Sequence, residues 1–130
     1  MDAQTGARYT LAGIRLVNGV AALLAPQMMA RRLGADPTRP ALIYALRMFG
    51  VRTVVLGAEL LLLKDADALR RALRVGTLIH ASDALSAAQA GRAGTLPPGP
   101  AMAATAISTV NVALTLVAQW PCCRPSARRH

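Results

Sequence analysis

Polar and ionisable side chains lie deep inside the long apolar segments of this chain. His80 and Asp83 are three residues apart, a spacing that places two side chains on one face of a helix. Histidine titrates near neutral pH, so this pair could exchange protons or hold a polar ligand. The other members of the set lie in the remaining apolar segments and are Arg15, Asn18, Arg52, Glu59 and Asn111. These seven residues are the candidate site residues.

The types and order of these residues match no established catalytic motif. The chain has no serine, histidine and aspartate arrangement with supporting context, no glycine-rich phosphate loop and no paired-carboxylate motif. Glu59, His80 and Asp83 could supply three metal ligands, but zinc and non-haem iron usually take two or more histidines, and His130 lies in the tail. The sequence therefore predicts no catalytic residue and no metal site, and it favours a role other than catalysis.

Four apolar segments carry these residues, each close to the ~20 residues that a helix needs to cross a bilayer. They cover residues 9–30, 40–63, 69–90 and 101–120, and a polar tail follows at 121–130. The fourth segment carries no charge, whereas the third is the least hydrophobic. Only 16% of all residues are charged, against about 25% in an average soluble domain. This pattern predicts a membrane protein.

The connections between the segments are short, which makes consecutive helices antiparallel neighbours. We therefore expect an all-α fold, an integral membrane four-helix bundle with up-down-up-down topology in a single domain. Lys and Arg residues are more frequent on the side of the two termini, by seven to four. The seven are Arg8, Lys64, Arg70, Arg71, Arg124, Arg128 and Arg129, and the four are Arg31, Arg32, Arg39 and Arg92. This bias predicts a multi-pass protein of the cell membrane with both termini in the cytoplasm.

The net charge of +9 raises the question of nucleic-acid binding. The arginines are dispersed along the chain, and no aromatic residues are interleaved with them to stack on bases. Basic residues at the ends of apolar segments act as topology signals and contact lipid head groups. We therefore expect membrane lipids, and no nucleic acid, as partners.

The cost of a charge in lipid requires the polar residues of each segment to face the interior of the bundle. Arg52 and Glu59 are seven residues apart, so they share one face of a helix. One interpretation is that Arg52 and Arg15 neutralise the acidic groups Glu59 and Asp83 and so hold the helices in register. The other is that the layer lines a small cavity, where His80 and one carboxylate exchange protons or bind a head group.

Short motifs in the first two segments resemble the DoxX-like group of small bacterial membrane proteins. They are Gly13-Ile14-Arg15 followed by Leu23-Leu24-Ala25-Pro26, and Leu46-Arg47-Met48-Phe49-Gly50-Val51-Arg52 leading to Gly57. The resemblance covers roughly residues 8–120. It implies a four-helix integral membrane fold and, for some members, partnership with quinone-linked or thiol-linked oxidoreductases. No catalytic residue is carried over, because the group has no settled set.

Three classes of function follow from these observations. The leading one is a non-enzymatic membrane subunit or accessory protein whose polar interior staples the helices or holds a lipid-like or quinone-like molecule, with an oxidoreductase as a candidate partner. The second is a small transporter or channel for protons or a small anion, with self-association into a homo-oligomer. The third is a soluble helical bundle, favoured by the weak third segment.

Overall fold

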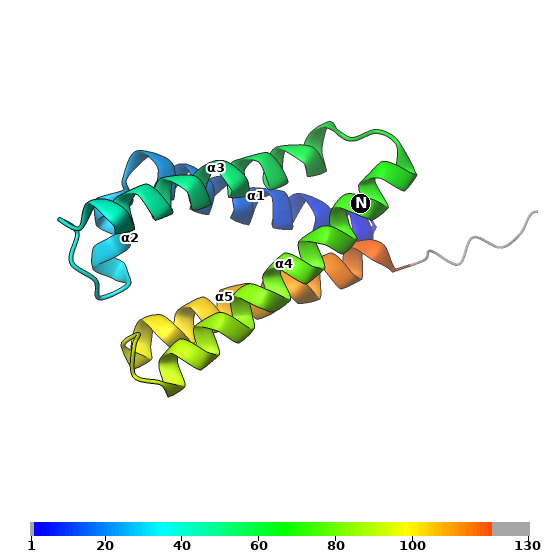
Figure 1. Ribbon diagram of the computed structural model, residues 1–130. Coiled ribbons are helices and arrows are strands. Elements are labelled where there is room, and N and C mark those ends of the chain that lie inside the picture. Colours follow the sequence, from blue (N-terminus) through cyan, green and yellow to red (C-terminus); the bar gives the residue numbers. More distant parts are fainter. Residues whose placement is uncertain (1, 121–130) are drawn as a thin grey trace, which may run out of the picture.

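The computed structural model describes residues 2–120, and these residues fold entirely as helices and short connections (Figure 1). The helices are α1 (Ala3–Leu24), α2 (Pro26–Arg32), α3 (Pro40–Leu62), α4 (Ala66–Arg92) and α5 (Pro98–Gln119). The expected all-α class is confirmed. Four of the helices are long, and α2 is a short helix between α1 and α3.

The predicted first segment, residues 9–30, is divided between two helices. Pro26 lacks a backbone N–H and disfavours helical geometry in the residue before it. Ala25 accordingly leaves the helix, with φ −130° and ψ 53°, and α2 turns by 107° from α1. The apolar length of this segment is therefore not the length of one straight helix.

Local sequence signals explain the other helix ends. The carboxylates of Asp2 and Asp65 accept hydrogen bonds from backbone N–H groups of the first turns of α1 and α4, at 2.7 Å each. Prolines begin α3 and α5, where a missing N–H costs nothing. Gly34 and Gly94 have positive φ and end the turns that follow α2 and α4. Pro98 starts α5 three residues before the predicted boundary at 101.

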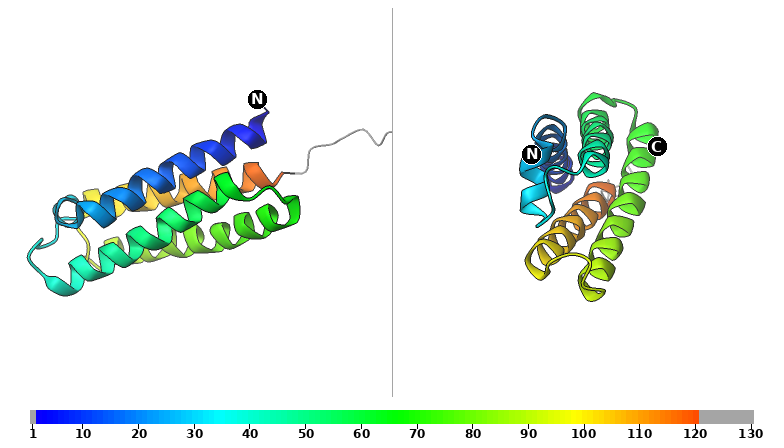
Figure 2. Two further views of the ribbon diagram at one scale, coloured as in Figure 1. Left: turned by 90° about the horizontal axis from the view of Figure 1, so that it is seen from above. Right: turned by 60° about the vertical axis from the view of Figure 1, so that its left-hand side comes forward.

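The long helices form two antiparallel pairs, α1 with α3 and α4 with α5 (Figures 1 and 2). The pairs cross, so they lie close together near the α3–α4 connection and diverge toward the end where α2 lies (Figure 1). A small core of Leu11, Ala12, Leu60 and Leu73 fills the close end. Between the pairs, α1 packs against α5 more extensively than α3 packs against α4, so polar contacts matter most for the position of α3 relative to α4.

Small residues make the close contacts inside each pair. A Cβ atom at Gly50 would lie 2.7 Å from the carbonyl oxygen of Gly19, so the backbones of α1 and α3 touch. Among residues 2–120, alanine accounts for five of the nine buried hydrophobic residues: Ala7, Ala12, Ala22, Ala30 and Ala101. Large hydrophobic side chains such as Val17, Leu62, Leu78 and Met102 are instead exposed. Small residues inside and large apolar residues outside are typical of helices packed in lipid.

Two of the described helices, α3 and α5, are long and apolar enough to cross a membrane. The bent pair α1 and α2 brings the number to three if it counts as one broken span. These helices support the expectation of a membrane protein. The helix α4 is not apolar enough by the same measure, because basic residues occupy its first half and His80, Ser82, Asp83 and Ser86 its second.

Candidate functional site

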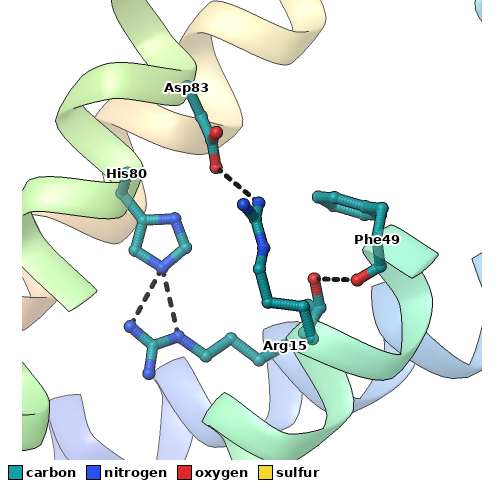
Figure 3. Close-up of polar contacts among 6 residues, drawn as sticks. Arg15, Phe49, His80 and Asp83 are labelled. Atoms are coloured by element: carbon teal, nitrogen blue, oxygen red, sulfur yellow. Dashed lines mark hydrogen bonds and ion pairs between the residues drawn. The ribbon is translucent and has the colours of Figure 1, made fainter. Parts of the chain in front are cut away.

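Arg15, near the middle of α1, is the largest of the fully buried side chains, with 1% of the residue exposed. Its Nε and Nη2 atoms lie 3.1 and 3.0 Å from Nε2 of His80 on α4 (Figure 3). Its Nη1 donates to the carbonyl oxygen of Leu56 on α3 at 3.1 Å. One side chain thus connects α1 with α3 and α4. It is the centre of the candidate site.

The contact with Arg15 determines the protonation state of His80. A guanidinium group has only hydrogen-bond donors, so Nε2 of His80 must accept with its lone pair. The imidazole is therefore neutral in this arrangement and carries its proton on Nδ1. Within residues 2–120, Arg15 has no carboxylate within ion-pair distance. A buried guanidinium held by a neutral ring and a carbonyl differs from the pairing with Glu59 or Asp83 expected from the sequence.

Two glycines leave the space that the guanidinium occupies. A Cβ atom at Gly76, one turn before His80 on α4, would collide with Nη2 of Arg15. A Cβ atom at Gly57 on α3 would lie 3.1 Å from Cβ of Arg15. Real Cβ atoms rarely come this close to a neighbour, so each position favours glycine. The side chain of Arg15 therefore packs against the backbones of two other helices.

A second polar contact links the two helix pairs beside the first. Nη2 of Arg52 on α3 lies 3.5 Å from Oδ2 of Asp83 on α4 (Figure 3). The side chains are 47% and 34% exposed, so this ion pair is only partly enclosed. The guanidinium of Arg52 also lies 5.5 Å from the centre of the Phe49 ring, which gives a cation–π contact. The sequence expected Arg15 and Arg52 to neutralise Glu59 and Asp83 without assigning the partners, and here Arg52 meets Asp83.

The remaining predicted residues join this layer less directly. Glu59 and Asn18 are half-buried, and Glu59 forms no ion pair with another described residue. Asn111 is 5% exposed, and its Oδ1 has no hydrogen-bond partner within the described part of the chain. Asn111 lies one turn before Thr115, whose hydroxyl is 3.0 Å from that of Thr77 on α4. This contact places Asn111 on the α4 side of α5.

Two sets of polar contacts were not expected from the sequence. Gln119 donates to the Thr77 hydroxyl at 2.9 Å, which extends the hydrogen bonds between α4 and α5. Arg8 donates to the carbonyl oxygens of Leu60 and Leu63 and so caps the C-terminal end of α3. The sequence predicted only that the positive charge of Arg8 acts as a topology signal. Thr77 and Gln119 are isolated polar residues within apolar segments, and this feature of the sequence could have indicated their contacts between helices.

Two surface hollows formed by residues 2–120 lie away from Arg15. One of about 480 Å³ lies between the end of α4 and the start of α5, beside Ala88, Arg92 and Met102. Another of about 430 Å³ lies between the two loops, beside Asp36 and Pro97. Within residues 2–120, no group of three or more His, Cys, Asp and Glu residues could hold a metal ion.

Comparison with protein-family models, with curated proteins and with solved structures finds no match to this chain. The DoxX-like resemblance stays a prediction from the sequence motifs. The class of protein that fold and composition define is a helical protein with two or three helices able to cross a membrane.

Proposed function

We propose that the protein is a small integral membrane protein in which α1, α3, α4 and α5 all cross the bilayer, and that it acts as a non-enzymatic membrane subunit. The observation that carries this proposal is the fully buried Arg15, bound to His80 and packed against α3, a helix apolar enough to cross a membrane. In this function the contact of Arg15 with His80 and the contact of Arg52 with Asp83 hold the two helix pairs together.

The depth of the charged layer supports four crossings. Arg15 and Arg52 each lie 12 residues after the first residue of their helices, α1 and α3 (15 − 3 and 52 − 40). At 1.5 Å per residue this is about 18 Å along the helix axis. The hydrocarbon core is about 30 Å thick, so the guanidinium group of Arg52 lies near its centre and that of Arg15 lies well inside it. The α4 residues that meet them, His80 and Asp83, must then lie at the same depth, which brings the weakly apolar α4 into the bilayer.

A transporter or channel is the alternative function, and the packing around Arg15 supports it less. A permeating proton or anion would need a hydrated route beside Arg15 and His80. The guanidinium instead lies against the backbone of α4 at Gly76, and the two surface hollows are elsewhere. We therefore expect no flux of protons or small anions into liposomes that contain the purified protein. A flux that Arg15→Met abolishes would favour the transporter.

Membrane fractionation tests the proposal directly. The full-length protein should stay in the membrane pellet after a carbonate wash at high pH, since integral proteins resist this treatment. Reporter fusions at the two termini should both report the cytoplasm. Release of the protein into the aqueous phase would refute the membrane crossings and would favour the soluble bundle.

Partners and ligands follow from the DoxX-like resemblance. We propose a membrane oxidoreductase as the partner and a lipid-like or quinone-like molecule as the ligand class. Purification in mild detergent followed by mass spectrometry of the bound proteins and lipids tests both. Purified protein that carries neither an oxidoreductase nor a lipid-like or quinone-like molecule at stoichiometric levels would count against this part of the proposal.

A further inference from the structure

The Arg52–Asp83 pair is less enclosed than a charged pair inside a membrane protein should be. Arg15 is buried, but the side chains of Arg52 and Asp83 keep 47% and 34% of their surfaces exposed. Arg52 is on α3 and Asp83 is on α4, so the partly exposed pair lies on the surface between these two helices. We name this surface the α3–α4 face and define it by Met48, Arg52 and Val55 on α3 and Asp83 on α4. The three α3 residues are at helical spacing, and all are exposed.

Lipid cannot satisfy these charges at the depth that the proposed function gives them. Head groups lie about 15 Å from the centre of the hydrocarbon core. Arginine can reach toward an interface with its long side chain, but aspartate has no such reach. Arg52 lies 3.5 Å from Asp83, so a move of its side chain toward the interface would break this ion pair. The exposed parts of both side chains therefore need a polar cover near the middle of the bilayer.

We propose that a second copy of this chain covers the α3–α4 face, so that the protein is a symmetric dimer in the membrane. The inference rests on the proposed membrane crossings. The face carries one positive and one negative group, and a two-fold rotation places Arg52 of one copy opposite Asp83 of the other, twice. A partner of a single charge would leave one group unsatisfied. When the two-fold axis is normal to the membrane, the rotation also keeps every group at its own depth.

The apolar residues beside the pair complete this interface. Met48 and Val55 are exposed on the same face of α3 as Arg52, one turn before it and one turn after it. In the dimer these side chains shield the four charges from lipid. The ring of Phe49, already in contact with Arg52, closes the same side of the pair. A polar centre surrounded by apolar residues is a common design of membrane helix interfaces, where polar groups hold the helices together.

Charge reversal in two separately tagged chains tests the dimer. A chain with R52D carries two acidic groups on the α3–α4 face, and a chain with D83R carries two basic groups. Each variant alone should dimerise about tenfold more weakly than the wild type, because like charges face each other across the axis. Co-expressed, the two variants should form a mixed dimer at the wild-type level. A pair that acts only within one chain predicts no such recovery, and its absence overturns the proposal.

Single-molecule photobleaching in liposomes of dilute protein gives the subunit number for each sample. R47D is the matched control, since Arg47 is exposed on α3 but five residues, and so about 140°, away from Arg52 around the helix. This variant should stay dimeric. If both charge-reversed chains fold poorly when alone, cross-linking of otherwise wild-type protein tests whether two copies meet at the α3–α4 face. With Cys122 and Cys123 replaced by serine, Val55→Cys should cross-link two copies, and Val117→Cys on the outside of α5 should not.

The outcomes separate this inference from the proposed function. Protein that resists the carbonate wash but stays monomeric at every protein-to-lipid ratio refutes the dimer and leaves the membrane crossings standing. Protein that the wash releases refutes both. Cross-linking at Val117 in place of Val55 also overturns the proposal, because it locates the contact on α5.

Discussion

Replacement of His80 by leucine is the most direct test of whether the contact of Arg15 with His80 holds the helix pairs together. The variant His80→Leu keeps a similar side-chain volume but removes the acceptor of two of the three hydrogen bonds that Arg15 makes. The guanidinium then stays buried with the carbonyl of Leu56 as its remaining partner. Because the charge cannot reach water, we expect the full cost of an unpaired buried group and not merely the loss of two contacts.

Two known energy ranges set the expected loss in the free energy of unfolding. Hydrogen bonds between membrane helices contribute about 0.6 kcal/mol on average and up to about 1.7 kcal/mol each. Removal of one partner from a buried charged pair costs about 3–5 kcal/mol in soluble proteins. His80→Leu should therefore lower the free energy of unfolding by about 2–4 kcal/mol. The double variant Arg15→Met, His80→Leu removes both partners and should lie within about 1 kcal/mol of the wild type, since apolar replacement of a buried pair is often neutral.

Unfolding in the bilayer by steric trapping measures these free energies without removal of the lipid. The four proteins of the double-mutant cycle are the wild type, each single variant and the double variant. A coupling energy of about 2 kcal/mol or more between Arg15 and His80 is the expected result. Equal destabilisation by His80→Leu and by the double variant would refute the reasoning, because the histidine would then contribute by packing alone.

Three further predictions concern other contacts. Gly76→Ala should destabilise the protein by about 1–3 kcal/mol because the new methyl group collides with Arg15, and the effect should largely disappear in the Arg15→Met background when the same trapping assay is used. Arg8→Gln should speed hydrogen exchange in the last turn of α3 by about fivefold, equivalent to about 1 kcal/mol, since the capped carbonyls lose their donor; unchanged exchange would refute the cap. Hydrogen bonds from Thr38, first from its side chain and then from its backbone N–H, lower the pKa of Asp36 in the α2–α3 connection. Because the folded pKa is depressed, this contribution to stability is complete above the ordinary pKa of 3.8 and is lost as the pH falls through the folded value, and Thr38→Val should raise the pKa of Asp36 in an NMR titration.

Several elements could be predicted from the sequence because their causes are local. Apolar length and turn residues located the helices α3 and α5 to within a few residues. A proline in the first segment was a sequence signal for the break at Ala25. The segment was nevertheless predicted as one helix, because its apolar composition continues across the proline. Helical spacing also gave the correct side of α5, since Asn111 is buried. It did not show that Glu59 and Asn18 are only half-buried, because the crossing of the helix pairs decides how far each is enclosed.

The choice of partner for each charge depended on the tertiary structure. One interpretation of the sequence had Arg15 and Arg52 neutralise Glu59 and Asp83 without saying which would meet, and the structure contains the pair Arg52–Asp83. Arg15 instead meets His80, because Gly76 on α4 leaves room for the guanidinium just where that imidazole lies. The sequence by itself predicted that these side chains face the interior of a membrane bundle, since lipid excludes charges. Only the rotation and crossing of the helices decided which groups met, because contacts across 41 to 65 residues of chain depend on packing that no local pattern encodes.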